Sequence, residues 1–106
     1  MLAKTERMNE LLDFYQTLLT QKQQLCMSLY YYEDYSLAEI AESLEISRSA
    51  VFDLLKRTEA ILESYENKLH CASDYRKRSA IYSEIKAVNN QVVNSLIDEL
   101  ENIENE

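Results

Sequence analysis

The segment LEISRSAVFDLLKR, residues 44–57, decides how this 106-residue chain folds. Ser47 is of a type that begins helices, because its hydroxyl can accept a hydrogen bond from a backbone N–H of the first turn. Ile46 and Val51 flank this serine at the spacing of a hydrophobic staple, in which the two side chains pack together. The segment therefore predicts a turn followed by a helix that begins at Arg48.

A shorter helix is predicted before the turn. SLAE, residues 36–39, is a capping box, in which Ser36 and Glu39 each bond the backbone of the other. Ala41 is small where the two helices approach closely. Two short capped helices separated by three residues are typical of a helix-turn-helix. The turn position usually held by glycine is Glu45, so we expect the turn to be either strained or slightly rearranged.

The composition favours helices throughout the chain. The chain contains neither glycine nor proline, whereas average usage would give roughly seven glycines and five prolines at this length. No residue therefore breaks a helix from inside, and every tight turn uses other residue types. Apolar residues make up 46% and charged residues 28%, which is ordinary for a globular domain. We predict an all-α protein.

Two more helices are predicted before the helix-turn-helix. The first covers residues 4–19, whose apolar residues form one helical stripe: Met8, Leu11, Leu12, Tyr15, Leu18 and Leu19. The second begins after Thr20, where TQKQ forms another capping box with Gln23. We expect this helix to direct Leu25, Leu29 and Tyr32 inward. The aromatic run YYYEDY, residues 30–35, is expected to use Tyr32 and Tyr35 for packing rather than for stacking on bases.

The helix from Arg48 is long, since its apolar stripe continues to about His70. CASD, residues 71–74, predicts a break because Ser and Asp favour caps and turns. A further helix is expected to direct five residues inward: Tyr75, Ile81, Tyr82, Ile85 and Val88. After a turn or kink at residues 89–90, the tail carries one more stripe beside an acidic face: Val92, Val93, Leu96, Ile97, Leu100 and Ile103.

These elements predict one compact domain of five or six helices. Its helix-turn-helix core, with the long recognition helix, covers residues 1–72, and a C-terminal helical extension covers residues 73–106. No apolar run approaches the roughly 18 residues of a membrane span, and the N-terminus lacks the apolar core of a signal peptide. We therefore expect a cytoplasmic protein that does not insert into membranes.

No set of residues indicates catalysis or a metal site. Cys26 and Cys71 are too far apart for a zinc knuckle or a redox pair, so we expect reduced thiols. His70 is a lone histidine near a helix end, without a partner acid, base and nucleophile. We expect no enzymatic activity, no metal and no cofactor.

The outward positions of the recognition helix form the candidate binding face: Arg48, Ser49, Phe52, Asp53, Lys56 and Arg57. Arg48 and Ser49 lie near the helix N-terminus, where base contacts are usual, while Lys56 and Arg57 would meet phosphates. Asp53 opposes phosphate binding, and the formal net charge of −8 is unlike that of a dedicated nucleic-acid domain. A protein surface that takes Phe52 as an apolar anchor is an alternative partner.

A second basic patch consists of Arg76, Lys77 and Arg78. These residues could pair with RNA phosphates, or they could form a solvated helix face that balances the acidic tail. Both interpretations remain open from the sequence.

Several motifs resemble those of a known family. LTQKQ, LYYYEDYSLAEIAESL, SRSAVFDLLKRTE and YENKLH are similar to the YlxM-like family of small bacterial helix-turn-helix proteins associated with the signal recognition particle. The resemblance extends over about residues 7–82. The same core resembles region 4 of sigma factors, where LT..Q, EIA and SR..V occur in the same order. Glu45 departs from the pattern, as does Ser49, where the family more often has glutamine.

The resemblance implies a regulatory, non-enzymatic role in the signal recognition particle pathway. The implied partners are the GTPase of the particle, its small RNA, or both. Two alternatives remain open: a DNA-binding transcriptional regulator, and an adaptor that forms a homodimer through its C-terminal helix.

Overall fold

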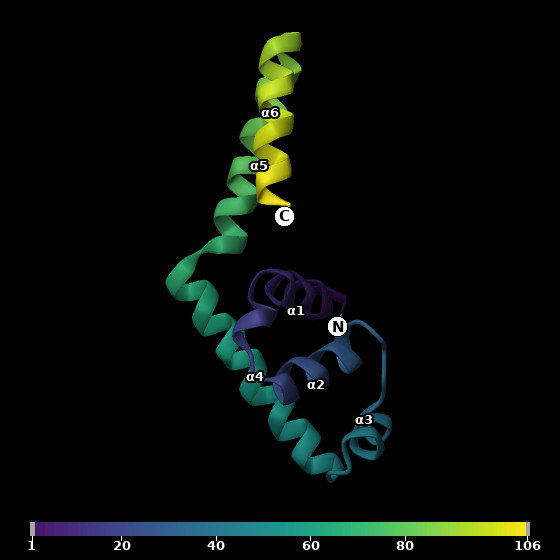
Figure 1. The fold of residues 1–106 in the computed structure, drawn as a ribbon. Coiled ribbons are helices and arrows are strands. Elements are labelled where there is room, and N and C mark those ends of the chain that lie inside the picture. The colour runs from purple at the N-terminus through teal and green to yellow at the C-terminus, as the bar shows by residue number, and fades with distance from the viewer. Residues whose placement is uncertain (1, 106) are drawn as a thin grey trace. The chain divides into compact units, whose positions relative to one another are not determined.

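The structure is a computed structural model that describes residues 2–105. These residues contain no strand, and the predicted all-α class with a helix-turn-helix is confirmed. The elements are α1 (Leu2–Tyr15), the 3-10 helix η1 (Gln16–Leu18), α2 (Gln21–Tyr31), α3 (Leu37–Leu44), α4 (Arg48–Leu69), α5 (Cys71–Ala87) and α6 (Gln91–Glu104). The chain divides after residue 69 into two compact units, the first with α1 to α4 and the second with α5 and α6 (Figure 1).

The first unit packs on α4. Helices α1, α2 and α3 all contact α4, and they lie along one side of it (Figure 1). The core takes apolar residues from all four helices: Met8, Leu11, Leu12, Tyr15, Cys26, Met27, Tyr31, Ile40, Ala41, Val51, Leu55 and Leu62. The stripe predicted for the first helix is confirmed at its first four positions. Its length is wrong, because the α-helix ends at Tyr15 and the 3-10 turn leaves Leu18 exposed.

The inward face predicted for α2 is wrong at Leu25 and Tyr32, while Leu29 is half-buried. Leu25 and Tyr32 are 47% and 41% exposed, whereas Cys26, Met27 and Tyr31 are buried. The apolar residues of α2 occur in the short runs LCM and LYY, so helical spacing alone allows more than one buried face. Packing against α4 selects the face that carries Met27 and Tyr31.

The helices of the first unit begin with the caps that the sequence indicates. The Thr20 hydroxyl accepts a hydrogen bond from the Gln23 backbone at 3.2 Å, and the Gln23 side chain accepts one from Thr20 at 3.0 Å. Ser36 and Glu39 form the same capping box, which lowers the pKa of the Glu39 carboxyl through the Ser36 backbone hydrogen bond. The Ser47 hydroxyl accepts from the Ala50 N–H at 3.1 Å.

The turn of the helix-turn-helix is made by Glu45 in the left-handed conformation, with φ 56° and ψ 44°. The Ile46 N–H donates to the Ala41 carbonyl at 3.1 Å, and the Glu45 N–H donates to the Glu42 carbonyl at 3.4 Å. These two bonds form a Schellman motif, which usually has glycine where Glu45 stands. The turn therefore keeps the ordinary geometry and accepts the strain of a left-handed non-glycine residue.

The second unit is a hairpin of two antiparallel helices (Figure 1). The predicted turn at residues 89–90 is present: Asn89 is left-handed with φ 61°, and the Asn90 side chain accepts from the Val93 N–H at 3.1 Å. The predicted break after α4 comes slightly earlier than CASD. The left-handed residue is His70, with φ 57°, and α5 begins at Cys71.

Of the five residues predicted to point inward after residue 74, Tyr75, Tyr82 and Ile85 are half-buried, whereas Ile81 and Val88 are exposed. The apolar stripe of the tail is largely exposed as well. Ile97 is buried, but the following large apolar side chains are exposed: Ile81, Val88, Val92, Leu96, Leu100 and Ile103. A hairpin has one interface, so each helix buries only the side that faces its neighbour. At that interface, Lys86 pairs with Asp98 and Glu101 at 3.0 and 2.6 Å.

We expect the substitution Glu45→Gly to stabilise the first unit by about 1 kcal/mol, because glycine adopts the left-handed conformation without the Cβ clash. Urea unfolding of the full chain measures the change. Glu45→Ala is the matched control, since it removes the same carboxylate and keeps the Cβ. Equal stabilisation by glycine and alanine would show that the charge of Glu45, and not its backbone, is unfavourable.

Candidate binding face of the helix-turn-helix

The structure places all six residues of the candidate binding face on one exposed side of the N-terminal part of α4. We call this surface the α4 face; it comprises Arg48, Ser49, Phe52, Asp53, Lys56 and Arg57. Val51, Leu55 and Thr58 lie on the opposite side and are buried. The Thr58 hydroxyl donates to the Leu54 carbonyl at 2.7 Å, so this polar group is satisfied within the helix. The core thus orients α4 and leaves the α4 face open to solvent.

At one edge of the α4 face, the carboxylate of Glu59 partly neutralises the positive charge of neighbouring lysines. The Glu59 carboxylate accepts a hydrogen bond from the Tyr31 hydroxyl at 2.7 Å and pairs with Lys4 at 3.1 Å. Lys56 approaches the same carboxylate at 3.8 Å, and its ammonium lies 5.4 Å from the centre of the Phe52 ring. A pocket of about 180 Å³ lies at this edge, lined in part by these residues. Lys56 therefore offers less charge to a ligand than the sequence suggests.

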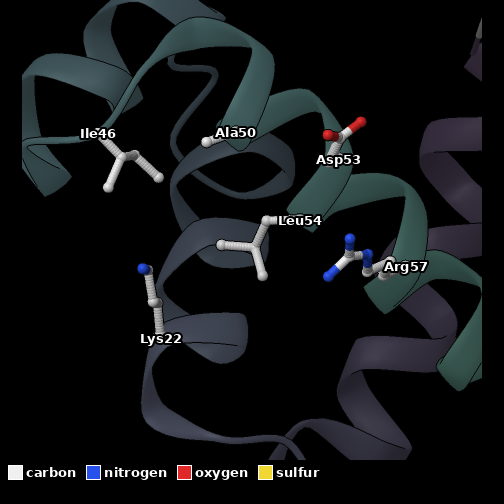
Figure 2. A pocket seen from close by; sticks show the side chains of 6 residues that line it. All are labelled: Lys22, Ile46, Ala50, Asp53, Leu54 and Arg57. Atoms are coloured by element: carbon white, nitrogen blue, oxygen red, sulfur yellow. The ribbon is translucent and has the colours of Figure 1, made fainter.

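The other edge of the α4 face borders a groove of about 250 Å³ between α2 and α4. We call it the Lys22–Arg57 groove. Its apolar floor consists of Ile46, Ala50 and Leu54, and Lys22, Asp53 and Arg57 complete its lining. Figure 2 shows Lys22 and Arg57 on either side of Leu54, while the Asp53 carboxylate points away from Leu54.

Within residues 2–105, neither Arg48, Arg57 nor Lys22 forms a salt bridge. Lys22 and Arg57 line the groove, whereas Arg48 lies in the first turn of α4, outside the groove lining. The groove therefore holds two uncompensated cations beside one carboxylate, that of Asp53. Lys22, Lys4 and Glu59 were missed by the sequence analysis. They belong to other helices or to a flank of α4, and the motif pattern contains no signal that places them at this surface.

The second basic patch belongs to the hairpin. Arg78 pairs with Glu104 of α6, so its charge is compensated within the second unit. Arg76 and Lys77 are exposed on α5. For Arg78, the sequence interpretation of a helix face that balances the acidic tail agrees with the structure.

Other candidate groups show no assembled reactive site in the described part of the chain. Residues 2–105 contain no group of three His, Cys, Asp or Glu side chains able to hold a metal ion. No described helix is long and apolar enough to cross a membrane. Neither cysteine forms a disulfide; burial raises the pKa of Cys26, which disfavours its reactive thiolate.

Comparison with known proteins gives one consistent family. Residues 2–103 match the family described as "UPF0122: Putative helix-turn-helix protein, YlxM / p13 like". The chain belongs to this YlxM / p13-like family. It is 51% identical to a UPF0122 protein of Halalkalibacterium halodurans, with 98% of this chain and all of the relative aligned. It is 47% identical to the UPF0122 protein YlxM of Bacillus subtilis, covering 97% of this chain and 98% of that relative.

A UPF0122 protein of Lactococcus lactis subsp. cremoris is 50% identical, with 99% of this chain and 96% of the relative aligned. In each of these relatives the alignment spans nearly the whole of both chains. The family membership therefore applies to both units and includes the α5–α6 hairpin.

We expect Tyr31→Phe to destabilise the protein by about 1.5–3 kcal/mol, since the buried hydroxyl donates to the charged Glu59. Tyr32→Phe is the matched control, because the Tyr32 hydroxyl donates to Asp13 at the same 2.7 Å but is exposed. Its loss should cost much less. Urea unfolding measures both changes, and equal costs would contradict the role assigned to burial.

Tyr31 and Tyr32 also make the stability of the folded protein depend on pH in the alkaline range. Burial of Tyr31 and the partial burial of Tyr32, followed by the carboxylate bonds, raise the pKa of both side chains in the folded protein. The stability that the two neutral hydroxyls contribute is therefore present below the unfolded tyrosine value of about 10, and it is lost as the pH rises above that value. Unfolding measured between pH 8 and 11 should show a smaller alkaline loss in Tyr31→Phe than in the parent chain. The range from pH 8 to 11 extends from about two units below to about one unit above the ordinary tyrosine pKa of about 10.

Proposed function

We propose that this protein acts by binding, not by catalysis, and that the α4 face engages nucleic acid. The observation that carries the proposal is that two exposed arginines of the α4 face, Arg48 and Arg57, form no salt bridge within the described residues of a helix-turn-helix. A helix of this motif enters the major groove of B-DNA, which is about 12 Å wide. Arg48 lies in the first turn of α4, where such a helix meets base edges.

The Lys22–Arg57 groove supports phosphate contacts beside α4. Two cations on different helices border an apolar floor, so a phosphate could approach both without displacing an existing salt bridge. Asp53 lines the same groove and opposes the contact, although its carboxylate points away from Leu54. We therefore assign the backbone contacts to Lys22 and Arg57 rather than to Lys56.

We further propose that the protein is a regulatory accessory factor of the signal recognition particle pathway. This part of the proposal rests on the resemblance of its motifs to the YlxM-like family. The order of α2, α3 and α4 also supports a likeness to region 4 of sigma factors. The proposed partners are the small RNA of the particle and its GTPase. Duplex RNA has a deep, narrow major groove that excludes a helix, so contact with RNA would involve its backbone and shape.

A DNA-binding transcriptional regulator is the second candidate function. The exposure of the entire α4 face favours it, because that face is free for insertion into a B-DNA groove. The two candidates share the α4 face and differ in the nucleic acid that it prefers.

A titration separates the two candidates. The full chain is titrated with duplex DNA, with the small RNA of the particle and with the particle GTPase, each at low and at physiological salt. Binding to the RNA or to the GTPase that persists at physiological salt is expected. Tight binding to one DNA sequence, without a response to the other two partners, would favour the transcriptional regulator. Absence of binding to any nucleic acid would overturn the proposed use of the α4 face.

Substitutions within the α4 face test the contacts. For duplex DNA, each lost phosphate contact should reduce the slope of log affinity against log salt by about 0.9. We expect Lys22→Gln and Arg57→Gln each to show this reduction. Lys56→Gln is the matched control and should change the slope less, because Lys56 is already paired with Glu59. A larger effect of Lys56→Gln would place the phosphate contacts at the opposite edge of the α4 face.

A further inference from the structure

The α5–α6 hairpin has large apolar side chains that lie outside its single helix–helix interface and are exposed to solvent. Ile81 lies on α5, and Val88 is the C-cap residue directly after it. Four others lie on α6, namely Val92, Leu96, Leu100 and Ile103. Contiguous exposed apolar surface of this kind marks an interaction site in soluble proteins. It is also independent of the α4 face, because every residue belongs to the second unit.

The exposed residues share one side of the hairpin. On α6 they recur at i, i+4, i+8 and i+11, which places them in one narrow stripe. At about 100° per residue, this stripe lies roughly 110° around α6 from the side that carries Ile97 and Glu101 towards α5. Ile81 and Val88 are offset from the side of α5 that faces α6 by roughly the same angle, in the same rotational sense. Because the helices are antiparallel, equal offsets bring both stripes to the same side.

The hairpin is too small to be stable by itself. Chains below about 40 residues usually need disulfides, metals or oligomerisation, because they bury too little apolar surface. The second unit comprises residues 70–106, and its cysteine forms no disulfide. A further apolar layer over the exposed side would give the hairpin a core.

The charges of the two helices select what can cover that side. Helix α5 carries four basic and two acidic residues, a net charge of +2, whereas α6 carries four acidic and no basic residues, a net charge of −4. Two copies of α6 side by side would repel each other. An α5 helix packed against an α6 helix of another copy would instead bring opposite charges together.

We propose that the exposed side of the hairpin binds a second copy of this chain and forms an antiparallel four-helix bundle. In this bundle, α5 of each copy packs over α6 of the other, and the two-fold axis runs along the helices. Bundles of this kind pack antiparallel helices around a shared apolar core. The proposed dimer does not depend on the partner of the α4 face.

The mass of the full chain tests the dimer. Light scattering coupled to size exclusion is expected to give about twice the 12.5 kDa of one chain. Leu96→Glu should reduce this mass to that of one chain, because it places a charge in the shared core. Leu25→Glu is the matched control: it introduces the same charge at a similarly exposed leucine of the first unit, and the mass should not change.

Circular dichroism distinguishes dissociation from general unfolding. The Leu96→Glu chain should keep the helical signal of the first unit and can lose at most that of the hairpin. A monomeric parent chain at every concentration overturns the proposal. It would indicate that the apolar side packs within one chain or binds a different protein. A Leu96→Glu chain that remains dimeric also overturns it.

Cysteine cross-linking tests the arrangement of the helices. Tyr75 bonds Asn105 at 3.2 Å, and Lys86 pairs with Asp98 and Glu101, so Ile81 and Leu100 lie at similar heights. A two-fold axis along the helices keeps these heights in the partner copy. In a Cys71→Ser background, mixing Ile81→Cys chains with Leu100→Cys chains should give a covalent dimer on oxidation. Cys26 is buried and should not react.

Each single-cysteine variant alone should cross-link much less than the mixture. Cross-linking of the Leu100→Cys chains with one another, without a mixed product, would place α6 against α6. That result would overturn the proposed arrangement even if the mass were that of a dimer.

Discussion

The fold depends on ending helices without glycine. Between α2 and α6, every connection contains a residue with positive φ, and these residues are Asp34, Glu45, His70 and Asn89. For a residue such as Glu45 this conformation costs roughly 1–2 kcal/mol relative to the right-handed one, whereas Asp34 and Asn89 are of types that adopt it more readily. The packing of the helices on both sides must therefore offset the free-energy cost of these left-handed residues. In the first unit α4 provides this packing, because α1, α2 and α3 all contact it.

The sequence predicts best where the apolar spacing allows one buried face. The α3–α4 segment is of this kind, since Ile40 and Ala41 lie between Glu39 and Glu42, and Val51 and Leu55 recur at helical spacing after the Ser47 cap. In α2 the apolar residues are adjacent, and the choice between Tyr31 and Tyr32 depends on Glu59, which belongs to a distant part of the chain. In the hairpin, periodicity identifies amphipathic helices but does not state how many neighbours each helix has.

The α4 face could be predicted residue by residue, but its charge distribution could not. Helical periodicity determines which side chains of α4 remain outside once the buried stripe is known. The charge that Lys56 presents depends on Glu59 and Lys4, and the groove depends on Lys22. Lys4 reaches Glu59 only when α1 packs on α4, and Lys22 borders the groove only when α2 packs on α4. Local pattern therefore defines the surface, and tertiary packing defines its electrostatics.

The separation of charge in this protein has a kinetic consequence. The chain carries a net charge of −8, whereas Lys22 and Arg57 outnumber Asp53 at the groove side of α4. Salt screens the net charge beyond about 8 Å at physiological ionic strength, so its long-range repulsion of the proposed polyanion would act mainly at low salt. Added salt should then speed the encounter and shorten the lifetime of the complex. If nucleic acid is the partner, as we propose, random sequences would be sampled rarely and only a ligand that fits the groove side of α4 would be retained.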